Sequence, residues 1–281
     1  LNAKLVVRCP PHVVDYIIYA PNSSIQDLSQ FTRCKAVLNL WAGVETIVGN
    51  RTLNQPLCRM VDGELQKGMT EWVTGHVLRY HLGMDKHIVN PERIWHDAQP
   101  PLAKDRPITI LGLGALGAAS ARMLDHLGFP VTGWSRRPKN ITNIHCLHGD
   151  DSLSLALQQA EILVLLLPDT PQTLNIINSD TLSQMPNGCV IINPGRGSLI
   201  DDEALLDALL TGHVASACLD VFRTEPLPKD DAYWKTPNVT VTGHVASGTR
   251  AESASRVIVQ NIARGEANLP FLYLVDRQAG Y

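Results

Sequence analysis

From Pro107 onward, short apolar runs alternate along the chain with longer amphipathic stretches. The apolar runs are rich in Val, Ile and Leu and predict β-strands at 108–111, 131–134, 162–166, 190–192, 214–219 and 239–241. The amphipathic stretches predict helices at 116–127, 152–159, 179–184 and 202–210. Strand-then-helix repetition of this kind indicates a doubly wound α/β domain, in which helices cover both faces of a parallel sheet.

The rest of the chain has a weaker pattern. Apolar runs predict buried strands at 15–20 and 36–40, and the stretch between them, 24–31, predicts a short helical connection. A long helix is expected over 68–87, followed by a polar passage with several prolines to residue 106. A helix at 249–264 follows the last predicted strand, so we expect the chain to return to its first domain. The expected domains are therefore 1–87 with 249–281, and 88–248.

Composition narrows the class of protein. A chain of 281 residues with 44% hydrophobic and 18% charged residues can form two globular domains. The longest strictly apolar run, 162–167, is far shorter than the roughly 20 residues of a membrane-spanning helix. A net charge of -3 without a basic block argues against binding to nucleic acid.

The six cysteines are scattered, without a C-x-x-C pair or a His/Cys cluster at zinc spacing. Scattered cysteines in a chain of this length are typical of reduced thiols, so we expect a cytoplasmic protein. No metal site is expected.

The glycine loop Gly112-Leu113-Gly114-Ala115-Leu116-Gly117 fits the G-x-G-x-x-G pattern. It lies between a predicted strand and a predicted helix, the context in which this pattern binds a dinucleotide. Gly112 permits the tight turn, Gly114 lets the backbone approach a pyrophosphate, and Gly117 lets helix and strand pack closely. Ala115 and Leu116 open the helix, whose N-terminus then faces the phosphates. The alternative is a purely structural turn.

The end of the second predicted strand indicates which cofactor is preferred. In NAD-binding domains an Asp or Glu at this position binds the ribose hydroxyl groups, but here the residues are Ser135, Arg136 and Arg137. A serine and two arginines can bind a 2′-phosphate, which a carboxylate would repel. We therefore expect NADP(H), with NAD still possible. The alternative is that both arginines belong to a solvated loop.

Three side chains that could take part in catalysis follow three successive predicted strands. Arg196 follows strand 190–192, Glu225 follows strand 214–219, and His244 follows strand 239–241. Each has an ordinary structural explanation when taken alone. Because parallel strands end at the same edge of the sheet, beside the glycine loop, the three together indicate a catalytic site.

These motifs, in this order, resemble the D-isomer-specific 2-hydroxyacid dehydrogenases. The resemblance rests on G-L-G-x-x-G, N-x-G-R-G, D-V-F-x-x-E-P-L-P and G-H-V-A. Three further segments are most similar to the glyoxylate/hydroxypyruvate reductase A branch: W-S-R after the second strand, L-W-A-G-V-E near the start, and the closing V-D-R-Q-A-G-Y.

The resemblance implies two Rossmann-like or flavodoxin-like domains, joined into a homodimer through the dinucleotide-binding domains. It also implies that the first domain lacks its first strand and helix here, so that residues precede Leu1 in the natural chain. It assigns Arg196, Glu225 and His244 as the catalytic residues. The substrate-binding and further cofactor-binding residues that it implies are Trp41, Ala42, Gly43, Pro168, Thr173 and Asp220. From the sequence alone, Asp220 is equally a strand-end turn residue.

The function expected from this set is NADPH-dependent reduction of a small 2-keto acid. Arg196 binds the substrate oxygens through its planar fork, and His244 protonates the alkoxide as general acid. Glu225 stabilises the imidazolium. Trp41 occupies a position that is often small in the family, which leaves the substrate open. Two alternatives remain: a non-catalytic, corepressor-like NAD(P)-binding regulator, and a family dehydrogenase for another acid, such as phosphoglycerate or formate.

Overall fold

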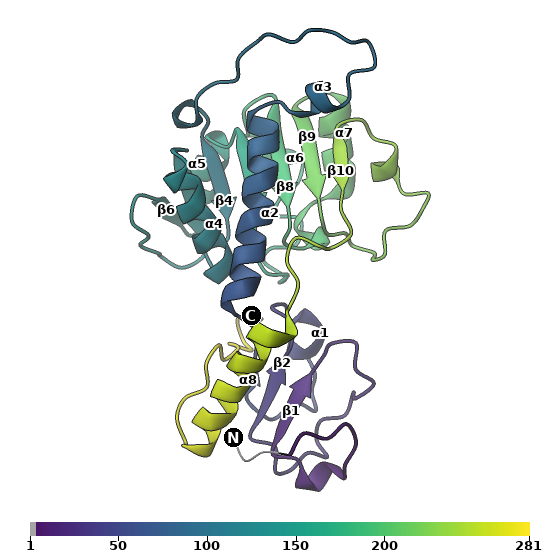
Figure 1. Ribbon diagram of the computed structural model, residues 1–281, viewed down its shortest axis with the longest axis vertical. Helices are drawn as coiled ribbons and strands as arrows, with labels where there is room; N and C mark the ends of the chain where they lie inside the picture. The colour runs from purple at the N-terminus through teal and green to yellow at the C-terminus, as the bar shows by residue number, and fades with distance from the viewer. Residues whose placement is uncertain (1–3) are drawn as a thin grey trace. The chain divides into compact units, whose positions relative to one another are not determined.

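The computed structural model describes residues 4–281, and the chain divides into two compact units (Figure 1). Unit 1 contains the chain up to Leu65 together with Gly248–Tyr281, and unit 2 contains Gln66–Ser247. The chain therefore leaves unit 1 once and returns to it once.

Unit 2 is built on a sheet of seven parallel strands in the order β10-β9-β8-β7-β4-β5-β6. The strands are β4 (Ile108–Leu111), β5 (Val131–Ser135), β6 (His145–His148), β7 (Ile162–Leu165), β8 (Cys189–Asn193), β9 (Val214–Leu219) and β10 (Val239–Val241). The order reverses between β4 and β7, which pair side by side although β5 and β6 lie between them in sequence. Ligands of doubly wound sheets bind outside the carboxyl ends of the strands at such a switch point.

Helices cover both faces of this sheet. The covering helices are α2 (Gly63–His81), α4 (Ala115–His126), α5 (Leu153–Gln158), α6 (Ser179–Ser183) and α7 (Asp202–Leu210). The short helix α3 (Asp85–Ile88) follows α2 and has no buried residue. Short 3-10 turns lie at Ala103–Asp105, Asp150–Ser152, Gly197–Leu199 and Ala232–Trp234. The predicted cap of α7 is present, because the Asp201 side chain accepts a hydrogen bond from the Ala204 amide.

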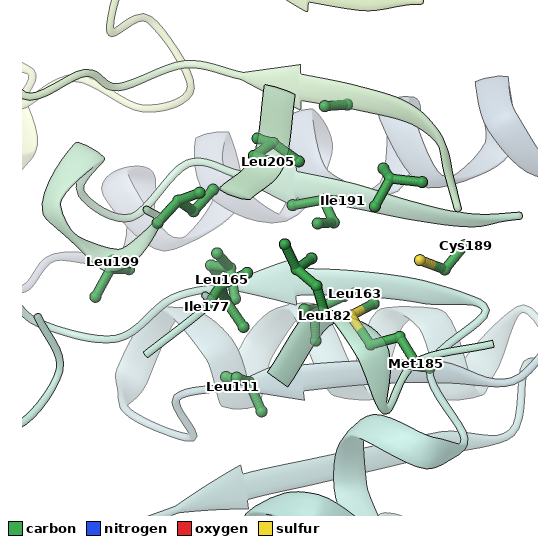
Figure 2. Packing of buried hydrophobic residues seen from close by; sticks show 14 of the residues in the cluster. Leu111, Leu163, Leu165, Ile177, Leu182, Met185, Cys189, Ile191, Leu199 and Leu205 are labelled. Atoms are coloured by element: carbon green, nitrogen blue, oxygen red, sulfur yellow. The ribbon is translucent and has the colours of Figure 1, made fainter. Parts of the chain in front are cut away.

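Alternation along the strands divides the core of unit 2 into two layers. Leu163 and Leu165 of β7 pack with α5, α6 and α7 on one face, and Figure 2 shows this apolar layer. Ile162 and Val164 point to the other face, where they pack with α2 and α4. Because side chains alternate along a strand, a strand that is apolar throughout is covered on both sides.

Unit 1 has a smaller parallel sheet in the order β1-β2-β3. Its elements are β1 (Tyr16–Tyr19), β2 (Ala36–Asn39), β3 (Leu57–Cys58), α1 (Glu45–Val48), α8 (Ala251–Glu266) and the 3-10 turn Pro11–Val13. Ala36 and Leu38 pack against α8, whereas Val37 packs with α1 on the opposite face. Both units are therefore α/β with parallel sheets.

The boundary between the units lies earlier than residue 87, where the sequence analysis puts it. Met69, Val73 and Val77 of α2 pack in one cluster with Ile108 and Ile110 of β4, so the part of α2 from residue 66 belongs to unit 2. The helix expected over 68–87 also ends early, at His81, before Gly83 adopts a φ of +59°.

The helical connection expected at 24–31 is wrong. The Leu28 amide donates to Thr52 Oγ1 at 2.8 Å, and the Asp27 carboxylate accepts from the Ser29 amide at 2.9 Å. These side-chain acceptors capture amides that a helix would use, so the segment is irregular. Across residues 4–281, no helix is both long and apolar enough to span a membrane.

Candidate active site

The glycine loop joins β4 to α4 at the switch point. Gly112 has a φ of +108°, and a Cβ there would collide with the Leu166 carbonyl at the end of β7. A Cβ on Gly117 would collide with the Gly112 carbonyl. A Cβ on Gly114, by contrast, would meet nothing within 4 Å, so open space lies over the N-terminus of α4. This space and the helix N-terminus fit a dinucleotide pyrophosphate.

The end of β5 carries Ser135 and the two arginines. Ser135 is buried, and its Oγ donates to the Arg137 carbonyl at 2.9 Å. Arg136 and Arg137 are exposed. The serine thus shapes the turn, and its hydroxyl oxygen can still accept a hydrogen bond but must rotate to donate one elsewhere.

The segment after β7 is held by its own threonines. Thr173 Oγ1 donates to the Pro168 carbonyl at 2.7 Å and accepts from the Thr170 amide at 2.9 Å. Both threonines are buried. Pro168 and Thr173 therefore belong to one closed turn at the edge where β4 and β7 end.

Arg196 lies just beyond β8, in a turn organised by the buried Asn193. Asn193 Nδ2 donates to the Arg196 carbonyl at 2.9 Å, and its Oδ1 accepts from the Gly195 amide at 3.1 Å. The guanidinium group of Arg196 is partly exposed, and its Nη1 donates to the Gly195 carbonyl at 2.6 Å. The sequence analysis does not single out Asn193, although a polar residue that ends an apolar strand is a usable signal.

Asp220, at the end of β9, holds the loop that carries His244. Its fully buried carboxylate accepts from the Val245 and Ala246 amides at 2.9 Å and from Thr242 Oγ1 at 2.5 Å. Its carbonyl accepts from the His244 amide at 2.7 Å. Asp220 is therefore a strand-end residue that organises the loop around His244.

His244 and Glu225 form a direct pair. His244 Nδ1 lies 2.7 Å from Glu225 Oε2, and the other carboxylate oxygen accepts from the Phe222 amide at 2.9 Å. The carboxylate is therefore fixed from both sides. With Nδ1 bonded to an acceptor, Nε2 is the ring nitrogen left to exchange a proton with a ligand.

A cavity of about 440 Å³ lies beside this pair. Its apolar lining residues are Phe222, Pro226, Leu227, Trp234 and Val241, and Glu225 and His244 form part of its polar wall. The pair thus borders an apolar space, and the space lies entirely within unit 2.

The expected carboxylate-binding loop lies in unit 1, after β2. Buried Asn39 donates through Nδ2 to the carbonyls of Trp41 and Gly43, at 2.8 and 2.9 Å. The Trp41 side chain is about half exposed. Ala42 lies between these two held carbonyls, so the loop has a defined turn.

The structure thus brings Glu225 and His244 into contact and places Arg196 on the neighbouring strand end. It puts the Trp41 loop in the other unit. Within residues 4–281, no group of three or more His, Cys, Asp or Glu side chains is arranged to bind a metal ion.

Comparison with known proteins identifies the family of this chain. Residues 77–246 match the family model described as "D-isomer specific 2-hydroxyacid dehydrogenase, NAD binding domain". A glyoxylate/hydroxypyruvate reductase A from Yersinia enterocolitica is 37% identical over 262 residues, which are 90% of this chain and 84% of that protein.

Two solved structures are also similar over nearly the whole chain. A D-isomer specific 2-hydroxyacid dehydrogenase from Xanthobacter autotrophicus, in complex with NADPH and MES, has a TM-score of 0.93 and 38% identity, covering 98% of this chain and 87% of that one. An NADPH-dependent glyoxylate/hydroxypyruvate reductase from Sinorhizobium meliloti, in complex with NADP and sulfate, has a TM-score of 0.89 and 33% identity, covering 97% and 90%. The chain described here belongs to the D-isomer specific 2-hydroxyacid dehydrogenase family.

Proposed function

We propose that this protein reduces a small 2-keto acid, of the glyoxylate or hydroxypyruvate type, to the 2-hydroxy acid with NADPH. The observation that carries the proposal is the 2.7 Å contact between His244 and Glu225 at the sheet edge that also bears the glycine loop. Relatives named glyoxylate/hydroxypyruvate reductase support the choice of substrate class.

In this proposal the cofactor is bound by unit 2. Gly112, Gly114, Ala115, Leu116 and Gly117 bind the pyrophosphate, where the open space at Gly114 and the N-terminus of α4 suit an anion. Ser135, Arg136 and Arg137 bind the 2′-phosphate. Pro168, Thr173 and Asp220 lie at the strand ends, where they line the nicotinamide side.

The chemical step needs a hydride and a proton, and the bound nicotinamide supplies the hydride. His244 donates the proton from Nε2 to the ketone oxygen, which develops negative charge as the carbonyl is reduced. Glu225 keeps Nδ1 protonated and stabilises the imidazolium, because a fixed carboxylate favours a neighbouring cation. His244 ends the step neutral and regains its proton from solvent.

Arg196 orients the substrate. Its guanidinium group has the planar fork that binds a carboxylate and polarises a carbonyl oxygen. Backbone amides of the loop Trp41-Ala42-Gly43 in unit 1 bind the substrate carboxylate. Unit 1 is then the substrate-binding domain and unit 2 the dinucleotide-binding domain.

We also propose that the protein is a homodimer joined through unit 2. An extended segment after α2 carries large, strongly exposed apolar side chains, namely Ile88, Val89, Trp95 and Leu102. Exposed large apolar side chains mark a protein interface where they gather on one surface. All six cysteines are free thiols, which suits the reducing cytoplasm that we propose as its location.

Initial rates test the function. We expect NADPH oxidation with glyoxylate and hydroxypyruvate, and slower turnover with NADH. Changing Ser135→Asp together with Arg136→Ala should shift the preference toward NADH, because the new carboxylate repels a 2′-phosphate and accepts from ribose hydroxyls. Binding of NADPH without turnover of any 2-keto acid would instead support the corepressor-like regulator.

A further inference from the structure

Arg223 lies in the segment between β9 and Glu225, and the proposed chemistry gives it no role. In the pattern D-V-F-x-x-E-P it occupies a variable position. Its guanidinium group nevertheless donates three hydrogen bonds to residues outside this segment. Nε donates to Asp202 Oδ2 at 3.0 Å, and Nη2 donates to Asn175 Oδ1 and to the Ile200 carbonyl.

These partners come from the connections after two other strands. Asn175 follows β7, whereas Ile200 and Asp202 follow β8. The two connections also pair with each other, since the Asn175 amide donates to the Ser198 carbonyl at 2.9 Å and the Ile177 amide donates to the Leu199 carbonyl at 3.0 Å. Arg223 thus ties the Glu225 segment to two connections that are already joined.

A second contact continues the network into the β9–β10 connection. Asp202 Oδ1 accepts from the buried Tyr233 hydroxyl at 2.9 Å, and the ring of Tyr233 lies 6.1 Å from that of Phe222. The backbone of Phe222 also lies so close to Gly197 that a Cβ on Gly197 would collide with it. The start of the segment that carries Glu225 is therefore held against the turn after Arg196.

We propose that Arg223 is a positioning residue, which holds the Glu225 carboxylate in the orientation that binds His244. Phe222 gives its amide to Glu225 Oε1, and Arg223 is the next residue, so a shift of the backbone there moves the carboxylate. The inference rests on the proposed function, in which Glu225 acts through His244. Exposed ion pairs contribute little to folding stability, and Arg223 and Asp202 are both partly exposed, so the proposed role is geometric.

Two carboxylates contact the segment that carries His244. Glu225 binds the imidazole ring, and Asp220 binds the neighbouring backbone amides. Asp220 is held by its own four hydrogen bonds from residues 242 to 246. Removing the Arg223 side chain should therefore disturb the hydrogen bond between Glu225 and the His244 ring. The hydrogen bonds between Asp220 and the backbone should stay intact.

The test is a double-mutant cycle on the full chain. Arg223→Ala should lower kcat about 10- to 100-fold, the loss that a small misplacement of a reacting group produces, while KM for the keto acid changes less than about threefold. In a Glu225→Gln background the same change should have almost no further effect on kcat. Arg223→Lys should recover part of the rate. Arg122→Ala, which removes an exposed arginine of α4, is the matched control.

A spectroscopic measurement keeps the inference testable without turnover. The NMR signal of the Nδ1 proton of His244, identified by its loss in His244→Gln, reports the hydrogen bond to Glu225 and should shift or disappear in Arg223→Ala at a fixed pH. Multiplicative effects of the two substitutions on kcat, or an unchanged Nδ1 proton signal, would refute the positioning role. A wild type that reduces no 2-keto acid would refute the proposed function, and the Nδ1 proton signal would then decide about Arg223 alone.

Discussion

His244 is held by two different carboxylates, and each controls a different part of the residue. Asp220 binds the surrounding backbone, so it fixes where the residue lies. Glu225 binds the ring, so it fixes which nitrogen carries a proton and how the ring is turned. A histidine that only filled space would not need both.

Replacing His244 tests its proposed role as general acid. His244→Ala should lower kcat about 10²- to 10⁴-fold, because a positioned proton donor contributes that much, and the loss corresponds to roughly 3–5 kcal/mol of barrier. The Kd of NADPH should stay nearly the same, since the glycine loop and the arginines after β5 are untouched. Steady-state rates and fluorescence titration measure the two quantities. Normal reduction of keto acids by this variant would show that the proton comes from elsewhere.

Replacing Glu225 tests the pairing in a different way. Glu225→Gln keeps the shape of the side chain and its hydrogen-bonding ability but removes the charge that stabilises the imidazolium. Reduction needs the protonated ring, so the alkaline limb of the kcat profile should move to lower pH, and activity at acid pH should partly survive. The profile is measured from pH 5 to 9 with NADPH saturating. An alkaline limb that stays in place would show that Glu225 is not the partner that matters.

At the scale of one side chain, the sequence predicts which side chains follow the strand ends but not their contacts. Arg196, Glu225 and His244 are predicted because each follows an apolar strand, and strands of a parallel sheet end together. The contact of Thr242 with Asp220, the amide bonds of Asn193 and the role of Arg223 depend on loop conformations. Loop conformations arise from tertiary contacts that no local pattern encodes.

At the scale of elements, predictability follows the strength of the apolar pattern. The six predicted strands of unit 2 are confirmed, because each is rich in apolar residues, and β4, β5 and β7 are buried along their whole length. The edge strand β6 is missed, since the residues His145-Cys146-Leu147-His148 have no apolar run and are at most half-buried. The strand β3 has only two residues, Leu57 and Cys58, which is too short to give a periodic signal.

The long helix α2 supplies a prediction about stability. His76 is half-buried, its ring lies tilted against that of Trp72 with centroids 4.2 Å apart, and its Nδ1 lies 3.3 Å from the buried Cys218 Sγ of β9. Burial lowers the pKa of His76 below its usual 6.5, and the charge of Arg79 lowers it further. Burial also raises the pKa of Cys218 to about 12, so the thiol stays neutral.

Because the folded pKa of His76 lies below the unfolded value, its stabilising contribution is complete above about pH 6.5 and is lost as the pH falls through the folded pKa. The free energy of unfolding should therefore fall less between pH 7.5 and 5.5 in His76→Gln than in the wild type. Denaturant unfolding of the full chain at each pH measures this. His126→Gln, in the exposed last turn of α4, is the control and should follow the wild type. Equal slopes for wild type and His76→Gln would contradict the prediction.

At the scale of the whole molecule, the sequence predicts that the chain leaves one domain and returns to it, but it misplaces the first crossing. The predicted boundary at residue 87 follows from assigning the whole predicted helix over 68–87 to the first domain. Helix α2 instead starts in unit 1 and continues in unit 2, because its apolar residues from Met69 onward pack on the larger sheet. A helix shared between domains gives no composition change at the boundary, so the sequence could not reveal it.

The proposed homodimer is the prediction that concerns the whole molecule, and the segment after α2 is where it can be tested. Figure 1 shows this segment as a long loop that arches out from unit 2. Within it Trp95 is 89% exposed and Val89 is 74% exposed, an exposure that is costly in water and is relieved when a second copy covers it.

Light scattering should therefore give the wild type twice the chain mass of 30.8 kDa. Val89→Asp combined with Trp95→Asp should shift the protein to a single chain, because two carboxylates cannot be buried there without partners. Leu210→Asp, at the equally exposed end of α7, is the matched control and should leave the dimer intact. Circular dichroism confirms that each variant is folded. A wild type of one chain mass at micromolar concentration, or a double variant that stays dimeric, would contradict an interface made by this loop.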